Sequence, residues 1–376
     1  MKTKNYEKKV CFLNGHLILR EHKTGVHYLH EQITKRICSD ENEFKTSVAY
    51  FDHNSKYSQF LNMTENRWMI NHVNVCTKAP RILSYFFPIE IFFGKNDIYF
   101  CDGLFPITFF KSKRICLVND LMVNIYPQNY TFIKKMYLKY FFRHLRRASK
   151  VVCISNNTKQ DIIKYYGIPE KNITVCYDGV NEEPKFTSIF ENKNIKPDEK
   201  FFLYIGDMRK NKNLPNTVRG FIRFCEENSN SNLYFYIAGK QNEEYETVKK
   251  IADTSKYSSR IKFLGYISEN DKCYLYEHTS ALVLLSFYEG FGMPIVEAMQ
   301  YKRPIITSNC SSMLEIGKDA AILVNPFDIS GIAKSMGIIS NGYSINQSIY
   351  EEKLKLYSFD NVANIIQNEI KKLLDE

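Results

Sequence analysis

The stretch SFYEGFGMPIVEAMQ, residues 286–300, decides the fold of the second half of this chain. It continues an apolar run at residues 282–285 that has the length of a buried strand. Gly290 and Gly292 then break any regular pattern, and Pro294 suits the first turn of a helix that runs to the end of the stretch. The sequence therefore predicts a strand, a tight turn and a helix in direct succession.

Two carboxylates flank this turn, because Glu289 precedes it and Glu297 lies about one helical turn into the helix. The first backbone N–H groups and the positive end of the helix dipole attract an anion, and the glycines let it approach the backbone. A diphosphate fits this position, with Glu289 near a sugar and Glu297 accepting hydrogen bonds from ribose hydroxyls. Each feature alone is also typical of an ordinary turn or a solvated helix face.

This stretch resembles the signature of the retaining GT-B glycosyltransferases of family 4, in which two Glu residues stand eight positions apart around Gly-Phe-Gly. Other segments resemble the family in the order in which they occur, namely FLYIGDMRKNKNL (202–214), YFYIAGK (234–240), IKFLGYISENDKCYLY (261–276) and KRPIITSNCSSMLEIGKDAAILVNPFD (302–328). The resemblance implies a nucleoside diphosphate sugar as donor, GDP- or UDP-linked, and places Gly290, Phe291, Gly292, Met293 and Glu297 at it.

The segment GDMRKNKN, residues 206–213, is expected to supply the remaining donor contacts. Gly206 permits close approach after a strand, Lys212 matches the family lysine, and Arg209 is assigned as its partner at the diphosphate. Many relatives carry Arg directly after this Gly or directly before this Lys, where this chain has Asp and Asn. The other side chains of this loop, Lys210 among them, are equally typical of a solvated surface.

The resemblance also implies a mechanism. The family retains the anomeric configuration, and we expect front-face attack in which the departing phosphate takes the acceptor proton. Fixed cations and helix N–H groups would stabilise the leaving diphosphate while Glu289 orients the sugar. The base is expected to be recognised by backbone groups around Tyr266. Because the chain has no Asp-x-Asp triplet, we expect that neither a metal nor another cofactor is required.

The first half of the chain resembles the family less closely. TGVHYLHEQI, residues 24–33, resembles the Gly-rich first loop, with Gly25 facing the donor and acceptor. CLVNDLMVNIYPQNY, residues 116–130, matches a segment that commonly reads His-Asp, but Asn119 stands in place of the His. Asp120 is in register and is predicted to bind acceptor or donor hydroxyls, although a helix cap is an equally typical role for it.

Apolar runs alternate with helical patterns along both halves, which predicts two α/β domains with parallel sheets. VCFLNGHLIL, residues 10–19, is read as the first strand. The resemblance implies two Rossmann-like domains facing each other across a cleft, with the last helix crossing back to the first domain. The predicted parts are an acceptor-binding domain (1–182), a linker (183–200), a nucleotide-sugar domain (201–356) and the crossover helix (357–376).

Composition agrees with a globular protein, since 44% of the 376 residues are hydrophobic and 24% are charged. The ten cysteines are scattered without a C-x-x-C pair, which favours reduced, buried thiols in the cytoplasm. The sequence contains no apolar run of about 20 residues, the length that a membrane-spanning helix needs. We therefore expect a cytoplasmic protein, at the inner face of the cytoplasmic membrane.

The formal net charge of +10 is partly concentrated in TFIKKMYLKYFFRHLRRASK, residues 131–150, where basic and aromatic residues alternate. This pattern is typical of a helix at an anionic membrane surface, and equally of an amphipathic helix whose aromatics face the core. The family resemblance favours the membrane surface. Nucleic acid is not expected as a partner, because no binding motif accompanies the charge.

Three functions remain open from the sequence. The preferred one is a retaining hexosyltransferase that extends a glycan or a polyprenyl-diphosphate-linked saccharide in the synthesis of O-antigen, capsule or lipopolysaccharide. The second is a sugar-nucleotide epimerase or a phosphorylase with the same two-domain fold. The third is a non-catalytic partner protein that still binds nucleotide, suggested by Asn119 and Asp207.

Overall fold

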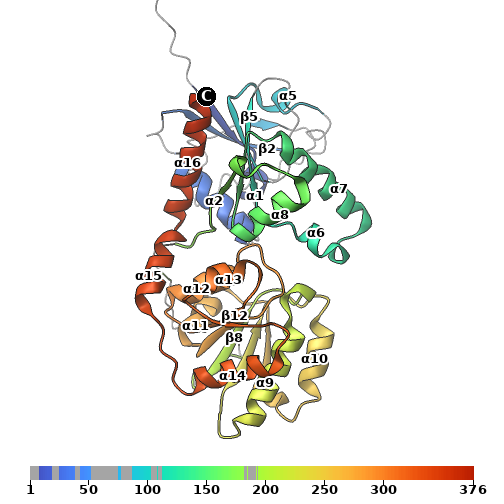
Figure 1. Cartoon of the computed structure of the whole chain (residues 1–376), viewed down its shortest axis with the longest axis vertical. Helices are drawn as coiled ribbons and strands as arrows, with labels where there is room; N and C mark the ends of the chain where they lie inside the picture. Colours follow the sequence, from blue (N-terminus) through green and yellow to red (C-terminus); the bar gives the residue numbers. More distant parts are fainter. Residues whose placement is uncertain are drawn as a thin grey trace, which may run out of the picture. The chain divides into compact units, whose positions relative to one another are not determined.

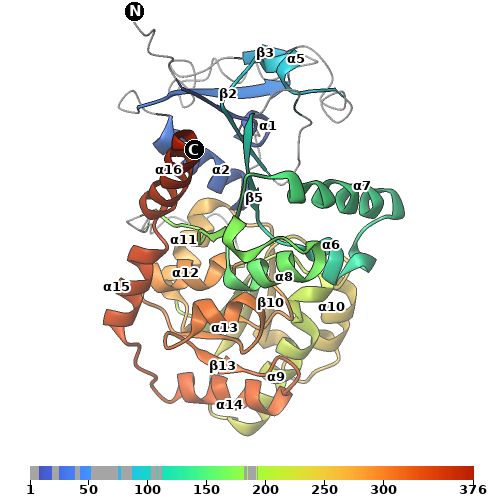
Figure 2. The ribbon, with the colours of Figure 1, turned by 45° about the horizontal axis from the view of Figure 1, so that its top comes forward.

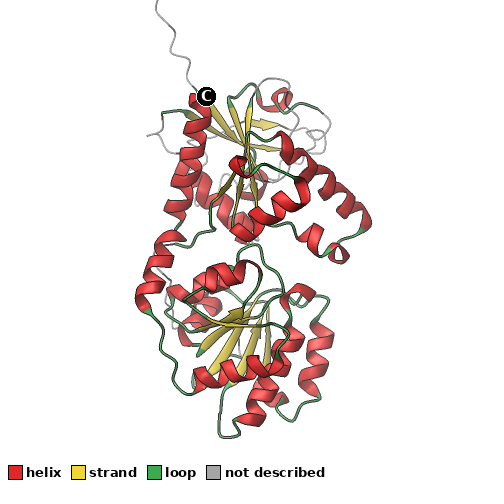
Figure 3. Cartoon of the chain, in the orientation of Figure 1, coloured by secondary structure: helices red, strands yellow, loops and turns green. Residues whose placement is uncertain are grey.

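The computed structural model describes residues 8–18, 25–38, 43–51, 75–77, 87–102, 108, 112–181, 184, 192 and 194–376. The chain forms two compact units, Met1–Gly179 with Ser358–Glu376 and Val180–Tyr357. Both are parallel sheets with helices packed on them (Figures 1 and 3). The predicted pair of Rossmann-like domains is thereby confirmed. Most of the predicted linker at 183–200 precedes residue 194 and lies outside the described residues.

The first unit contains a seven-stranded parallel sheet in the order β3-β2-β1-β4-β5-β6-β7. Apolar residues fill β1, β4 and β6, as expected for strands covered on both faces. The strands are β1 (Lys9–Phe12), β2 (Lys45–Phe51), β3 (Val75–Thr77), β4 (Ile98–Cys101), β5 (Lys113–Val118), β6 (Lys150–Cys153) and β7 (Ile173–Val175). The helices are α1 (Gly15–Ile18), α2 (Gly25–Ile37), α5 (Glu90–Phe93), α6 (Met122–Ile125), α7 (Phe132–Arg143), α8 (Asn156–Tyr166) and α16 (Phe359–Asp375), with 3-10 turns at Pro127–Asn129, His144–Arg147 and Glu170–Asn172.

The prediction of a first strand over residues 10–19 was wrong at its second half. The strand β1 ends at Phe12, and Gly15–Ile18 forms the short helix α1. Gly15 lies so close to β2 that a Cβ atom there would stand 2.7 Å from the carbonyl oxygen of Ala49. This close approach turns the chain where Asn14, Gly15 and His16 interrupt the apolar run.

The second unit contains a six-stranded parallel sheet in the order β10-β9-β8-β11-β12-β13. The strands are β8 (Phe201–Ile205), β9 (Tyr234–Ala238), β10 (Ile261–Gly265), β11 (Ala281–Leu284), β12 (Ile305–Ser308) and β13 (Ile322–Val324). The helices are α9 (Leu214–Glu227), α10 (Tyr245–Asp253), α11 (Glu269–His278), α12 (Met293–Gln300), α13 (Ser311–Gly317), α14 (Ile329–Ser340) and α15 (Gln347–Leu356), with 3-10 turns at Lys210–Lys212 and Ser258–Arg260. The strand, turn and helix predicted from residues 282–300 correspond to β11 and α12.

The last helix, α16, returns to the first unit and lies beside α2, as the resemblance implied (Figure 1). Phe359 at its start packs edge-on against Tyr28, and the guanidinium of Arg36 lies 5.5 Å from the centre of its ring. Gly179 passes so close that a Cβ atom there would stand 2.7 Å from the Phe359 ring. The start of α16 therefore packs closely against residues of the first unit and belongs to that unit.

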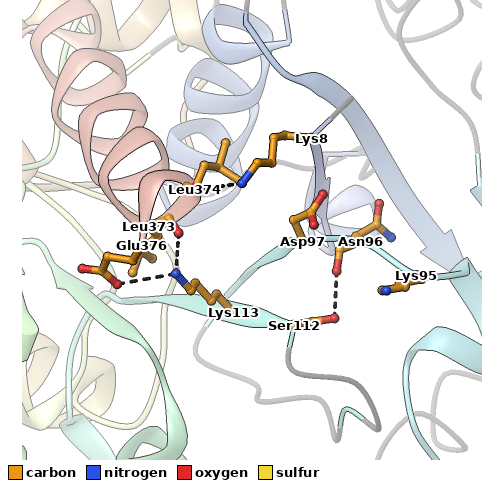
Figure 4. A pocket seen from close by; sticks show the side chains of 9 residues that line it. All are labelled: Lys8, Lys95, Asn96, Asp97, Ser112, Lys113, Leu373, Leu374 and Glu376. Atoms are coloured by element: carbon orange, nitrogen blue, oxygen red, sulfur yellow. Dashed lines mark hydrogen bonds and ion pairs between the residues drawn. The ribbon is translucent and has the colours of Figure 1, made fainter. Parts of the chain in front are cut away.

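Lys8, directly before β1, and Lys113, in β5, hold the C-terminal end of α16. Lys8 Nζ donates to the carbonyl of Leu374 and Lys113 Nζ donates to that of Leu373, both at 2.6 Å (Figure 4). Cations at a helix C-terminus satisfy its last carbonyls and oppose the negative end of the dipole. The cavity of about 490 Å³ at this edge of the sheet is lined by these lysines and by Lys95, Asn96, Asp97, Ser112 and Glu376. Two of its charged groups, Lys8 and Lys113, thus hold the helix.

No helix among the described residues is long and apolar enough to cross a membrane. Among the same residues, nine cysteines carry no disulfide and eight of them are buried. Burial raises the pKa of the Cys225 thiol to about 11, so this thiol is protonated and unreactive near neutral pH.

Candidate active site

Each sheet has one point where the order of its strands reverses. In the second unit this point lies between β8 and β11, because β9 and β10 extend the sheet on one side and β12 and β13 on the other. Open parallel sheets bind ligands beyond the carboxyl ends of the strands at such a point. The loops that follow β8 and β11 carry Lys212 and Glu289, so the sequence-predicted donor residues lie where the topology favours a ligand.

The loop after β8 begins with a close contact between two backbones. Gly206 has φ +154 and Gly239 has φ +137, and a Cβ atom on Gly239 would stand 2.0 Å from the carbonyl oxygen of Gly206. The loop then forms the turn Lys210–Lys212 and enters α9 through Asn213, which has φ +57. The Asn213 side chain donates to the carbonyls of Leu285 at 2.9 Å and Pro326 at 2.7 Å. These contacts fix the backbone next to Lys212.

Lys212 and Glu289 form an ion pair at this edge. Lys212 Nζ lies 2.7 Å from Oε1 and 2.8 Å from Oε2 of Glu289, and Ser286 Oγ donates to Oε1 at 2.6 Å. The two side chains are 19% and 12% exposed, so the pair is largely withdrawn from bulk water but still reachable. Such a pair holds both charges in place before any ligand arrives.

The backbone of Glu289 is held from α13. The hydroxyls of Ser311 and Ser312 both donate to its carbonyl oxygen at 3.0 Å. Ser311 itself has φ +54, a left-handed conformation that residues with a Cβ atom rarely adopt. The carboxylate is therefore anchored both through its own oxygens and through its main chain.

The turn into α12 places glycines where the sequence predicted an approaching anion. Gly292 is the N-cap of α12 with φ +106, and Gly290 and Met293 are only partly buried beside it. Phe291 is 3% exposed and packs edge-on against Tyr357 with ring centres 5.5 Å apart. Its ring belongs to the core of the second unit, so it offers a ligand only its backbone.

Glu297 lies in α12 and is held from α11. Tyr276 donates its hydroxyl to Oε2 at 2.6 Å, and Lys272 Nζ lies 3.2 Å from Oε1. The Glu297 side chain is 21% exposed, so part of the carboxylate faces solvent. The prediction that it accepts hydrogen bonds from a ribose is untested by these contacts, which involve only protein donors.

Two other predicted residues stand on the surface. Arg209 Nη2 lies 3.2 Å from Asp207 Oδ2, with side chains 50% and 41% exposed. Tyr266 is 83% exposed, directly after Gly265 at φ +69. Both would have to contact a ligand from the rim of the site.

The predicted residues of the first unit lie in their expected elements. Gly25 begins α2, and a Cβ atom there would meet nothing within 4 Å. Asp120 follows β5, and its Oδ1 accepts from the backbone N–H of Met122 at 2.8 Å, two residues on, whereas the N-cap of α6 is Leu121. Asn119 Oδ1 is buried without a hydrogen-bond partner within the part of the chain that the structure describes.

Comparison with known proteins assigns the chain. The family "Glycosyl transferases group 1" matches residues 185–354, and "Glycosyltransferase Family 4" matches residues 106–184. This chain belongs to glycosyltransferase family 4. The family comprises retaining hexosyltransferases that use nucleotide-sugar donors and glycan acceptors.

Individual relatives of this glycosyltransferase are distant. It is 27% identical over 292 residues to the O-antigen chain mannosyltransferase RfbU of Salmonella typhimurium, a match that covers 76% of this chain and 77% of the relative. Sucrose-phosphate synthase of Thermosynechococcus elongatus superposes with a TM-score of 0.69 at 13% identity, over 98% of this chain and 100% of that one. HepE of Anabaena, solved with UDP and glucose, superposes with a TM-score of 0.62 at 14% identity. The match covers 97% of this chain and 100% of that one. The solved structures show the GT-B fold alone.

The glycosyltransferase carries a second polar cluster that the sequence reading missed. In the first unit the strand order reverses between β1 and β4, and Asn14 and Asp102 follow these strands. His16 Nε2 lies 3.1 Å from Asp102 Oδ2, and Asn14 Nδ2 lies 3.2 Å from Nδ1 of the fully buried His30. Among the described residues, His30 Nε2 and Asn14 Oδ1 are buried without a partner. The sequence signal for this cluster was the presence of His16 in the predicted first strand and of His30 in the next helix.

The buried imidazole of His30 makes the stability of the glycosyltransferase depend on pH. Burial lowers its pKa from 6.5 to about 4, with Asp102 opposing and His16 and His27 adding to this shift. Between about pH 6.5 and about pH 4, His30 is therefore protonated in the unfolded chain but neutral in the folded chain. We expect the free energy of unfolding to fall by about 2 to 3 kcal/mol between pH 7 and pH 4.5 through this group alone.

Urea denaturation of wild type and His30→Gln across this pH range measures the contribution. The variant is expected to show a shallower decline, because glutamine cannot take up the proton. Parallel declines in the two proteins would show that other groups cause the pH dependence.

Among the described residues, no three His, Cys, Asp or Glu side chains gather as metal ligands. Whether the glycosyltransferase requires a metal stays a prediction from the sequence.

Proposed function

We propose that this glycosyltransferase transfers a sugar, with retention of configuration, from a GDP- or UDP-sugar to a glycan or lipid-linked saccharide of a bacterial surface polysaccharide. O-antigen, capsule and lipopolysaccharide are the polymers considered. The observation that carries the proposal is the pair of Lys212 and Glu289 at the strand reversal of the second unit, held by Ser286. The name of the relative RfbU makes mannosyl the first group to test.

In this proposal Lys212 serves two groups at once. An ammonium has three N–H donors, and the carboxylate of Glu289 is the partner recorded for Nζ among the described residues. A further donor is available for a phosphate oxygen of the donor sugar, while the start of α12 faces the diphosphate with its N–H groups. Lys212 then stabilises the charge on the leaving diphosphate, and Arg209 adds a second cation from the rim.

Glu289 acts as the group that orients the donor sugar. Its carboxylate is fixed by Lys212 and Ser286 and its carbonyl by two serines of α13, so it presents a fixed acceptor to sugar hydroxyls. Glu297 accepts from the ribose, and the backbone near Tyr266 meets the base. The first unit, with Gly25 and Asp120, binds the acceptor.

The first test is calorimetric titration of the protein with GDP, UDP, ADP and dTDP, with Glu297→Ala as the control variant. We expect one nucleotide to bind selectively and the substitution to weaken it about 10- to 100-fold, because a charged hydrogen-bond acceptor is lost. The sugar donors of that nucleotide are then assayed for transfer. Absence of binding by all four would contradict the donor site, and binding without transfer would favour a non-catalytic partner protein.

We also propose that α7 rests on the anionic inner face of the cytoplasmic membrane. Several of its described apolar side chains are exposed, with Phe132 72%, Ile133 81%, Met136 57% and Tyr140 55% exposed. Only Phe142, which packs against Tyr166, turns toward the core among the aromatics whose side chains are described. The helix extends at the side of the first unit away from α16 (Figures 1 and 2). Four basic residues, Lys134, Lys135, Lys139 and Arg143, accompany the exposed apolar ones.

The double substitution Phe132→Ser with Ile133→Ser tests this contact by sedimentation with vesicles of phosphatidylglycerol or phosphatidylcholine. We expect wild type to bind the anionic vesicles and the variant to bind them at least about 10-fold more weakly, because two large apolar side chains no longer enter the interface. Tyr266→Ser removes an equally exposed aromatic from the second unit and should leave binding unchanged. Equal binding by wild type and the α7 variant would contradict the proposal.

A further inference from the structure

Glu297 is held through both of its carboxylate oxygens by a single neighbouring helix. Tyr276 donates to Oε2 at 2.6 Å, and Lys272 donates to Oε1 at 3.2 Å, both from α11. Tyr276 is fully buried, whereas the Lys272 and Glu297 side chains are 28% and 21% exposed. The carboxylate is therefore fixed from the protein side while its remaining surface faces outward.

The Glu297 carboxylate keeps acceptor sites that its protein partners do not occupy. An ionised carboxylate accepts at about four lone-pair sites, two on each oxygen. Because one donor among the described residues occupies each oxygen, one site on each oxygen is left for a ligand. Two adjacent acceptors of this kind match two adjacent hydroxyl donors, which is the arrangement of a vicinal diol.

The two protein donors to Glu297 stay protonated. Burial by itself would lower the pKa of Lys272, but Glu297 and Glu269 outweigh it and raise the pKa, so the ammonium persists. Burial and the charge of Glu297 raise the pKa of the Tyr276 phenol well above its ordinary value, so the phenol stays a donor. Glu269 shares Lys272 at 3.1 Å and so limits how far the ammonium can move.

We propose that Tyr276 and Lys272 are positioning residues that present Glu297 to the 2′,3′-diol of a ribose, so that the site selects ribonucleoside over 2′-deoxyribonucleoside diphosphates. The inference rests on the proposed function, since it assumes that a nucleotide binds at α12. It goes beyond that function by naming the residues that set the selection. It also predicts weaker binding of deoxythymidine diphosphate, which lacks the 2′-hydroxyl.

The experiment compares UDP with 2′-deoxy-UDP, and GDP with 2′-deoxy-GDP, by calorimetry on wild type, Tyr276→Phe and Lys272→Met. We expect wild type to bind the 2′-deoxy form about 10- to 100-fold more weakly, because one acceptor of a charged carboxylate is left without a donor. In both variants the ratio of the dissociation constants of the 2′-deoxy and ribo forms should fall below about 3-fold. The reason is that a carboxylate released from its partner can rotate toward the hydroxyl that remains. Tyr276→Phe removes only the hydroxyl and retains the buried ring.

Lys249→Met is the matched control, because Lys249 pairs with Asp253 on α10 within the same unit. It should keep the wild-type ratio. A wild-type ratio near one, or variants that keep a large ratio, would overturn the inference while leaving nucleotide binding intact. If wild type binds neither UDP nor GDP, both the inference and the proposed function are overturned. Melting temperatures of the two variants separate loss of selection from loss of fold, and a folded variant that keeps the wild-type ratio overturns the role of the residue that it replaces.

Discussion

Lys212→Met is expected to reduce the rate of sugar transfer by about 1,000-fold at saturating donor, with a smaller effect on nucleotide affinity. The reason is that Lys212 meets the leaving diphosphate as its charge develops, and removal of one such electrostatic contact typically costs about 10² to 10³ in rate. The substitution also leaves Glu289, which is 12% exposed, without its cation. The measurement is steady-state transfer from the sugar donor that the nucleotide titration identifies.

Lys210→Met is the appropriate control. Lys210 is an exposed lysine in the same turn as Lys212, so the same substitution removes an equal charge. It should retain the wild-type rate. A double-mutant cycle with Glu289→Gln should be strongly non-additive, since the two side chains are joined at 2.7 Å and act as one unit. Additive losses, or a folded Lys212→Met protein with the wild-type rate, would remove Lys212 from the reaction.

Gly239→Ala is expected to lower the free energy of unfolding by about 3 kcal/mol or more and to weaken nucleotide binding. The new methyl group would stand 2.0 Å from the carbonyl oxygen of Gly206, at a φ of +137 that residues with a Cβ atom rarely adopt. Because Gly206 begins the loop that carries Lys212, relief of this clash displaces the loop. Urea denaturation and calorimetry with the preferred nucleotide measure the two effects.

Gly342→Ala separates backbone strain from the clash. Gly342 also has a positive φ, +96, but a Cβ atom there would meet nothing within 4 Å. We expect a loss of only about 1 kcal/mol and unchanged nucleotide affinity, because the strain is local and far in sequence from the loops of the site. Similar losses for the two variants would show that close packing at Gly239 contributes little.

The local features of the site were predictable because they depend on neighbouring residues. The turn through Gly292, the helix after it and the loop glycine Gly206 each follow from short sequence patterns, and the structure places them as expected. The pairing of Lys212 with Glu289 was not predicted. These residues are 77 positions apart and meet only because β8 and β11 are neighbours in the sheet.

The same limit explains what the sequence reading missed. His16 and Asp102 are 86 positions apart, so their contact required the adjacency of β1 and β4. The hold of Tyr276 and Lys272 on Glu297 depends on how α11 packs beside α12, which periodicity does not report. The choice between a core-facing and an outward-facing aromatic helix at α7 also depended on packing, and the structure settles its side-chain exposure.

The return of α16 to the first unit makes that unit discontinuous, whereas Val180–Tyr357 is one uninterrupted piece. A ribosome therefore releases every strand of the first sheet, and then the whole second unit, before the helix that covers α2 is synthesised. During that interval the second unit has all of its elements, but the first still exposes the apolar face that Phe359 and its neighbours will cover. Translation that stops before residue 358 would release a chain with a complete second unit and a first unit whose apolar face beside α2 stays uncovered.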